Sequence, residues 1–312
     1  MLKQSSTQVS DLQAALDHKA FLRSLTAEQR AVLTAKQDCA GYIHLAGHLG
    51  ALALSGTYIA LGLPLWWLMM LPHGMMLVLL FTLLHETSHD TVFASLRANR
   101  IVAAFCGVVL LIPPVWFKYF HLAHHRHTHD PDADPELETP KPETWRAYLW
   151  HLTGLPTWRA KVATLLANAQ GKASAAYIPE RKRGQVRQEA YVMLAFYATV
   201  LLLAFATSAT WILTLWIIPA LLGEPALRFY LMAEHGRCPH AANMFENTRT
   251  TLTNRIVRFF AWNMPYHAEH HAFPTVPFHK LPQLHDLTQA HLQQVSQGYR
   301  AFHRNYAADL TR

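Results

Sequence analysis

The chain has 312 residues, of which 51% are apolar and only 15% are charged, with a formal net charge of +7. A charged share below the typical value of about 25% excludes a disordered or supercharged chain and argues against an ordinary water-soluble globule. Histidine is unusually frequent, since 21 histidines exceed the 20 carboxylates, while three cysteines without C-x-x-C pairing predict neither a disulfide framework nor a thiolate metal site. Composition therefore indicates a membrane protein that binds metal.

The two ends of the chain are predicted to be cytoplasmic. Residues 1–42 are polar and lack the apolar core of a signal peptide, so they are interpreted as an amphipathic arm. Thr26 and Gln29 match a capping box at the start of a short helix in this arm. Residues 291–312 are expected to form a C-terminal helix, and residues 43–290 to form one membrane domain between the two ends.

Four apolar stretches lie in that domain, in two pairs that are each joined by a short turn. They are residues 43–63 with 65–84, and residues 191–206 with 211–232. A bilayer core needs about 20 helical residues, so we predict an all-α integral membrane bundle of four helices, arranged as two hairpins. Residues 101–112 are also apolar, but at about 1.5 Å per residue they are too short to cross, and we interpret them as a re-entrant, interfacial or buried segment.

Basic residues determine the predicted orientation. The turns near Pro64 and Ser208 contain no Lys or Arg, whereas residues 118–187 contain 11 and residues 237–312 contain 8. The positive-inside rule places both termini and the central segment in the cytoplasm, where they would form a helical cap on the bundle. Because topology accounts for the basic charge and no nucleic-acid motif accompanies it, we expect no nucleic-acid partner.

Nine histidines form four clusters that, in this topology, emerge at one membrane face. Within a cluster their spacings of three and four place imidazoles on one side of a helix, where two rings can reach one ion or two adjacent ions. Nine imidazoles are too many for one tetrahedral zinc and suit two ions such as iron. The candidate metal ligands are His85, His89, His121, His124, His125, His235, His267, His270 and His271.

Several other polar residues lie near these histidines in sequence. His127 and His129 remain open as additional ligands, whereas His44 and His48 are interpreted as packing residues. Carboxylates and one amide could hold imidazole N–H groups from behind. These candidates are Glu86, Asp90, Asp130, Asp132, Asp134, Asn263 and Glu269.

Three segments together resemble the histidine boxes of the membrane fatty-acid desaturase family, which includes related hydroxylases and ketolases. H-E-T-S-H at 85–89 is similar to the first box, H-L-A-H-H at 121–125 to the second, and H-A-E-H-H at 267–271 to the third, while His235 matches the extra ligand of that family. The resemblance covers about residues 40–290, and the strings around the boxes look like bacterial members. It implies a non-haem di-iron centre that uses O2 and external electrons to attack an unactivated C–H bond, in a bacterial inner membrane.

Desaturation of a fatty acyl or similar lipid substrate is the leading function that we predict. Hydroxylation, or another oxidation, of an amphiphilic small molecule remains the alternative, because both begin by hydrogen abstraction. A His-rich metal transporter is disfavoured, since transport needs ligands near the bilayer midplane. We expect electrons from a separate ferredoxin-type or cytochrome-type donor, because no donor domain is recognisable and three cysteines cannot hold an iron–sulfur cluster.

Two charged residues lie inside the last predicted span. Glu224 and Arg228 have i, i+4 spacing beside Pro225, and charges at this depth are costly unless they are paired or line a cavity. They are either a structural ion pair or a contact for the substrate head group.

Overall fold

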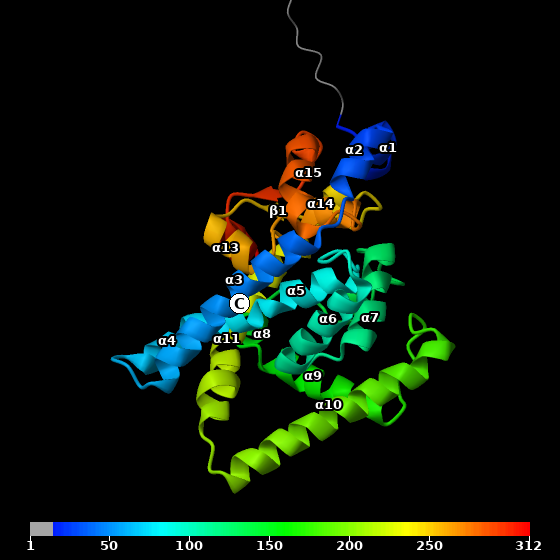
Figure 1. The fold of residues 1–312 in the computed structure, drawn as a ribbon. Helices are drawn as coiled ribbons and strands as arrows, with labels where there is room; N and C mark the ends of the chain where they lie inside the picture. The colour runs from blue at the N-terminus through cyan, green and yellow to red at the C-terminus, as the bar shows by residue number, and fades with distance from the viewer. Residues whose placement is uncertain (1–14) are drawn as a thin grey trace, which may run out of the picture.

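The computed structural model describes residues 15–312, and this part of the chain is almost entirely helical (Figure 1). The first half contains α1 (His18–Ser24), α2 (Ala27–Leu33), α3 (Asp38–Ala60), α4 (Trp66–Val78), α5 (Leu80–Ser88), α6 (Leu96–Leu110), α7 (Pro114–His127), the short 3-10 helix η1 (Pro135–Glu138), α8 (Trp145–Leu152) and α9 (Leu155–Ala169). The second half contains α10 (Glu180–Ala206), the π-helix η2 (Leu213–Ile217), α11 (Ile218–His235), α12 (Met244–Asn247), β1 (Thr250–Thr251), α13 (Arg255–Phe260), α14 (His267–Ala272), η3 (Phe278–Lys280), α15 (Leu281–Thr288), β2 (Val295–Ser296) and α16 (Tyr299–Ala308).

Three helical segments are long and apolar enough to cross a membrane. They are α4 with α5 (Trp66–Ser88), α10 (Glu180–Ala206), and η2 with α11 (Leu213–His235). Each is longer than the apolar stretch in the sequence, because the helix continues past the first polar residues. α6 and α7 together give a fourth candidate, which is bent by 99° and is either a broken span or a re-entrant loop.

The predicted first span is not among these segments. Residues 43–63 are helical for most of their length within α3, which begins earlier, at Asp38, and ends at Ala60. His44 and His48, together with four glycines, lower the mean hydropathy of this helix below that of the other three. A turn in which Gly62 and Leu65 both have a φ of 61° then leads into α4. The structure therefore contains long helices at all four predicted spans, but only three of these helices are apolar enough to be candidate membrane spans.

Close backbone contact joins the two hairpins at the crossing of α4 and α11. A Cβ added to Gly74 would lie 1.9 Å from the carbonyl oxygen of Pro219, and one added to Gly223 would lie 2.3 Å from that of Gly74. Small residues at a crossing let membrane helices approach and pack tightly. α11, whose last residue is His235, is thereby fixed against the helix that leads into His85.

The bend between α6 and α7 is enclosed by contacts with other helices. α6 ends at Leu111, which has a φ of 60°, and Pro114 then begins α7. Tyr197 of α10 and Trp216 of η2 each donate a 2.8 Å hydrogen bond, to the carbonyls of Val108 and Val109. These bonds give two carbonyls at the end of α6 a donor from a neighbouring helix, and that of Val108 also accepts the Leu111 amide.

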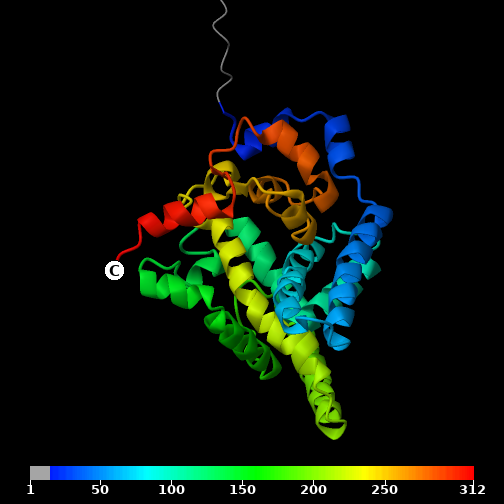
Figure 2. The same ribbon diagram turned by 90° about the vertical axis from the view of Figure 1, so that its left-hand side faces the viewer.

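Segments from both ends of the chain form a layer over one end of the bundle, which we call the terminal layer (residues 15–37 and 236–312). Figure 2 shows α1 and α2 (blue) beside α15 (orange) at the top, with the turn between α10 and α11 (yellow-green) at the bottom. The predicted capping box of Thr26 and Gln29 is present at the start of α2, while residues 1–14 of the predicted arm lie outside the described part. The C-terminal helix is shorter than 291–312, because Val295–Ser296 pairs in parallel with Thr250–Thr251 before α16 begins.

Candidate metal centre

Four helices bring the nine predicted histidines together beneath the terminal layer. α5, α7 and α11 end at this place, and α14 carries the last three histidines. Helix C-termini carry partial negative charge, which favours a cation at the point where they converge. Seven of the nine residues are 5% exposed or less: His85, His121, His124, His235, His267, His270 and His271.

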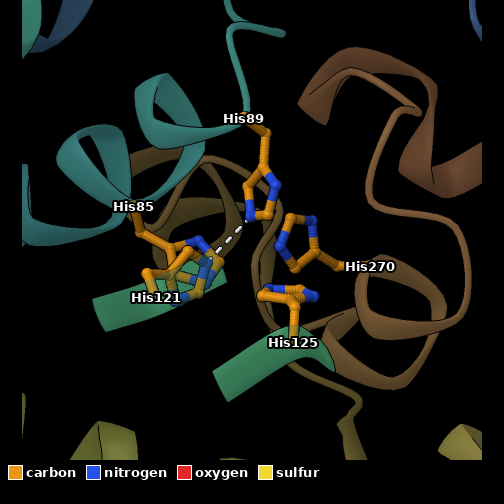
Figure 3. A group of neighbouring side chains, drawn as sticks. All are labelled: His85, His89, His121, His125 and His270. Atoms are coloured by element: carbon orange, nitrogen blue, oxygen red, sulfur yellow. Dashed lines mark hydrogen bonds between the residues drawn. The ribbon is translucent and has the colours of Figure 1, made fainter. Parts of the chain in front are cut away.

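The first group contains five of these histidines (Figure 3). Each offers a ring nitrogen within 4.8 Å of those of the others: His85, His89, His121, His125 and His270. The Nε2 atoms of His89 and His121 are 2.8 Å apart. Within the described part of the chain, both ring nitrogens of His85, of His125 and of His270 are buried without a hydrogen-bond partner. Buried imidazoles are normally paired, so these unpartnered nitrogens fit the nitrogen ligands of a metal ion.

The second group contains the other four histidines. His124, His235 and His271 offer nitrogens within 4.8 Å of one another. His267 joins them, because its Nε2 lies 3.2 Å from Nε2 of His235, and Nε2 of His124 lies at the same distance from that atom. Three Nε2 atoms therefore face one point, and the nine histidines divide into sets of five and four.

Oxygen atoms behind the second group orient its rings. Nδ1 of His124 lies 2.9 Å from Oδ1 of Asp134. Burial opposes ionisation of Asp134, but the hydrogen bond and charge attraction of His124, together with backbone N–H donors of Glu136 and His129, hold the pKa of Asp134 below its usual value. The remaining Nδ1 contacts are His235 with the carbonyl oxygen of Asn247 at 3.2 Å, His271 with Oγ1 of Thr128 at 3.1 Å, and His267 with Oε1 of Glu234 at 3.6 Å.

Burial keeps the third histidine cluster neutral. It lowers the pKa of His267, His270 and His271 well below the usual histidine value, and neighbouring imidazoles lower it further. A neutral imidazole has the free lone pair that metal binding requires.

Among the residues predicted to hold imidazole N–H groups, Asp134 lies beside the second histidine group and Glu86 beside the first. Oε2 of Glu86 is 3.7 Å from Nδ1 of His270, while its Oε1 accepts hydrogen bonds from Thr91 and from the Phe278 amide. Sequence reasoning missed Glu234, Thr128 and Asn247. A neighbouring histidine could have indicated Glu234, but Asn247 acts through its backbone carbonyl, for which a sequence holds no signal.

The other candidates make different contacts, and within residues 15–312 none of their side chains is hydrogen-bonded to a predicted ligand. Asp90 pairs with Lys118 at 2.6 Å, and Glu269 bonds to Thr250 and His285. Asn263 donates to the Phe278 carbonyl, and the side chain of Asp130, which lies on the surface, accepts from the backbone of Asp132. Proximity in sequence placed them near the site, but their side chains contact other partners.

The remaining histidines near the site belong to neither group. His127 is half-buried, whereas His129 is buried beside His235, with 5.4 Å between their ring centroids. Burial lowers the pKa of His129 to about 4. His44 bonds to the Phe259 carbonyl and stacks on the Phe259 ring, and His48 contacts Met76 and Trp262, as expected of packing residues.

Glu224 and Arg228 belong to a buried cluster of three charges. The carboxylate of Glu224, which is 0% exposed, lies 3.0 Å from Nε of Arg228 and 3.0 Å from Nζ of Lys161. Lys161, from α9, was not predicted. Gly154, with a φ of 71°, lets the turn before α9 approach closely, since a Cβ there would lie 2.3 Å from Cγ of Glu224. Two cations thus share one carboxylate.

A family model described as "Fatty acid desaturase" matches residues 60–303, which is most of the chain. The chain belongs to the fatty acid desaturase family. The membership and the apolar helices together identify it as a membrane protein. In this desaturase-family chain, the matched region contains all nine histidines of the two groups.

Three curated proteins resemble this desaturase-family chain at low identity. They are a zeaxanthin 4-ketolase of Chlamydomonas reinhardtii (24% identity, 77% of this chain and 54% of that protein), a sphingolipid delta(4)-desaturase of Komagataella phaffii (24%, 67% and 58%), and the sphingolipid delta(4)-desaturase/C4-monooxygenase DES2 of Rattus norvegicus (26%, 64% and 58%). The chain spans a little over half the length of these relatives.

Proposed function

We propose that the protein is a membrane oxidoreductase that binds two iron ions and uses O2 to oxidise a fatty acyl or lipid-like substrate. The observation that carries the proposal is the gathering of nine histidines in two adjacent groups, with buried ring nitrogens that have no hydrogen-bond partner among residues 15–312. The first ion would be held by His85, His89, His121, His125 and His270. The second would be held by His124, His235, His267 and His271.

Bound iron would supply O2 activation for oxidation of an unactivated C–H bond, with electrons from a ferredoxin-type or cytochrome-type donor. The residues of the chain set the conditions for this chemistry. Burial of the imidazoles keeps water away from their ring nitrogens. Asp134 and Asn247 would fix which nitrogen of His124 and His235 faces an ion. Neutral histidine ligands would leave the positive charge of the two ions uncompensated by these side chains.

Desaturation is the favoured outcome, with hydroxylation or a related oxidation of an amphiphilic molecule as the alternative. The printed names of the relatives include a desaturase, a ketolase and a desaturase that is also a monooxygenase, so the family supports both. Membranes supplied with a reduced donor and labelled fatty acyl substrates would separate them. An alkene product supports the first and an alcohol supports the second.

Metal analysis tests the proposal most directly. The purified protein should contain two irons per chain, and His267→Ala should lose iron and activity together. Activity must be measured on the same preparation, because zinc can replace iron during overexpression. A fully active protein that holds one zinc, or no metal, would contradict the di-iron proposal.

We infer four membrane crossings, with α3 as one of them and α6–α7 as a re-entrant loop. A Cβ on Gly41, near the start of α3, would lie 2.5 Å from the carbonyl oxygen of Val92, just after the first histidine cluster, so α3 starts at the level where α5 ends. The rings of His85 in α5 and His121 in α7 are 4.0 Å apart, so α7 returns to that same level.

The basic segments favour a cytoplasmic centre and termini in a bacterial inner membrane. Cysteine labelling at positions 62 and 208 should then occur only from the outer side.

The charge cluster of Glu224, Arg228 and Lys161 is the proposed contact for a substrate head group. Its support is the excess of one positive charge in a buried position, which favours an anionic or strongly polar partner. Neutralising Glu224, Arg228 and Lys161 together should change substrate preference. Unchanged activity and preference would leave the cluster a structural ion pair.

A further inference from the structure

His129 lies beside the second group and is buried without a hydrogen-bond partner for its ring. The residue is 6% exposed, and neither of its ring nitrogens has a hydrogen-bond partner in the part of the chain that the structure describes. Its ring centroid is 5.4 Å from that of His235 on one side and 5.2 Å from that of His240 on the other. A buried polar group without a partner is costly, which is a reason to look for a ligand at this ring.

The backbone of His129 is held in a strained conformation. Its φ of 61° lies in the left-handed region, which residues other than glycine rarely adopt unless their surroundings impose it. Oδ2 of Asp134 accepts the backbone N–H of His129 at 2.8 Å, and Nδ1 of His240 lies 3.0 Å from its carbonyl oxygen. Oδ1 of Asp134 is also hydrogen-bonded to Nδ1 of His124. The same carboxylate therefore orients the His124 ring and the backbone of His129.

The two groups differ by one imidazole, five against four. We propose that His129 is the fifth nitrogen donor to the ion of the second group, a role that rests on the proposed function. Its nitrogens lie outside the 4.8 Å set of His124, His235 and His271, so binding requires a change of side-chain rotamer. The ring has no hydrogen bond to break when it turns. His127, two residues earlier, is half-buried and has no comparable contact with the group.

A neighbouring cavity makes the proposal testable by chemical rescue. His129, His127 and His240 line a cavity of about 380 Å³ at the protein surface, which is large enough to admit free imidazole. His129→Gly removes the ring and suits the positive φ, so the backbone can keep its conformation. The experiment measures iron per chain and the chelator concentration that removes the more weakly held ion, with and without added imidazole.

We expect His129→Gly to release one of its two ions at a chelator concentration about tenfold lower than the wild type, and imidazole to restore retention. His127→Gly removes another side chain that lines the same cavity, and this control variant should retain iron like the wild type. Wild-type retention in His129→Gly would overturn the proposal, and so would a loss that imidazole does not restore, because that would show a positioning role only. If His129→Gly fails to fold by circular dichroism, His129→Asn, which also tolerates the left-handed region, replaces it in the retention assay.

The same measurements separate this proposal from the broader one. A wild-type protein that binds fewer than two irons contradicts the di-iron function itself. If the wild type binds two irons and His129→Gly retains both as strongly as the wild type, only the role of His129 is contradicted.

Discussion

The two histidine groups lie side by side, yet the protein holds them in different ways. In the second group, Nδ1 of three rings lies next to an oxygen atom; the pairs are His124 with Asp134, His235 with the Asn247 carbonyl, and His271 with Thr128. In the first group, His85 and His125 have no hydrogen-bond partner at either nitrogen, and the nearest carboxylate to His270 is 3.7 Å away.

This difference shows two ways of building a metal site. Oxygen acceptors would fix the tautomer and direction of the second-group rings before an ion binds, and Nε2 of His124 already lies 3.2 Å from Nε2 of His235. The first group relies on the rigid placement of α5, α7 and α14 and on the ion itself to select ring orientation. We therefore expect mutations behind the rings to weaken the second ion selectively.

The largest effect should come from removing one ligand of each group. His270 and His271 are adjacent on α14 but belong to different groups, so His270→Ala and His271→Ala should each keep about one ion per chain and lose activity entirely. Metal analysis and Mössbauer spectra should show that the two variants retain different ions. If both variants kept the same residual ion, the division into two groups would be wrong.

The next effect concerns acid stability of the metal-free protein. The folded pKa values of His267, His270 and His271 are depressed, and that of His129 is about 4, whereas the unfolded values are near 6.5. The unfolded chain therefore binds more protons below pH 6.5, and stability should fall as pH drops from 6.5 towards 4. The loss should reach several kcal/mol, at about 1.4 kcal/mol per pH unit for each group.

Thermal melting at pH 7.5 and pH 5.5, with and without iron, measures this loss. Bound iron should protect both groups, because a ligated nitrogen cannot take a proton until the ion leaves. A metal-free protein with the same melting temperature at both pH values would show that the imidazoles are not buried as described.

A smaller and selective effect is expected for Asp134→Asn. An amide offers one acceptor oxygen, so it cannot serve both Nδ1 of His124 and the backbone of His129. Loss of such an outer partner typically lowers metal affinity 10–100-fold, and here only the second ion should weaken. Asp130→Asn, an exposed change in the same loop, is the control. Equal weakening of both ions would contradict separate anchoring.

The sequence was sufficient to predict the helical class and the nine clustered histidines, because spacing within helices and apolar length are local properties. The first predicted span stays a prediction, because α3 is a long helix whose histidines and glycines lower its hydropathy. The sequence could not show Lys161, which contacts Glu224 from a helix 63 residues away. The oxygen atoms that lie behind the histidine rings were harder still to predict. Asp134 could be suspected from its place after the second cluster, but Asn247 acts through a carbonyl and Thr128 through one hydroxyl, and only the folded chain brings these atoms to the rings.

The smallest expected effect tests that hydroxyl. Thr128→Val keeps the shape of the side chain but removes the hydrogen bond between Oγ1 and Nδ1 of His271, at a cost of about 1 kcal/mol. The second ion should then bind roughly fivefold more weakly, since about 1.4 kcal/mol corresponds to a factor of ten, while the first ion should be unaffected. Thr87→Val is the matched control, because Thr87 is equally buried but its hydroxyl bonds only within α5, to the Leu84 carbonyl. If chelator titrations gave equal losses in both variants, hydroxyl removal would act through helix stability, and the orientation of His271 would not depend on Thr128.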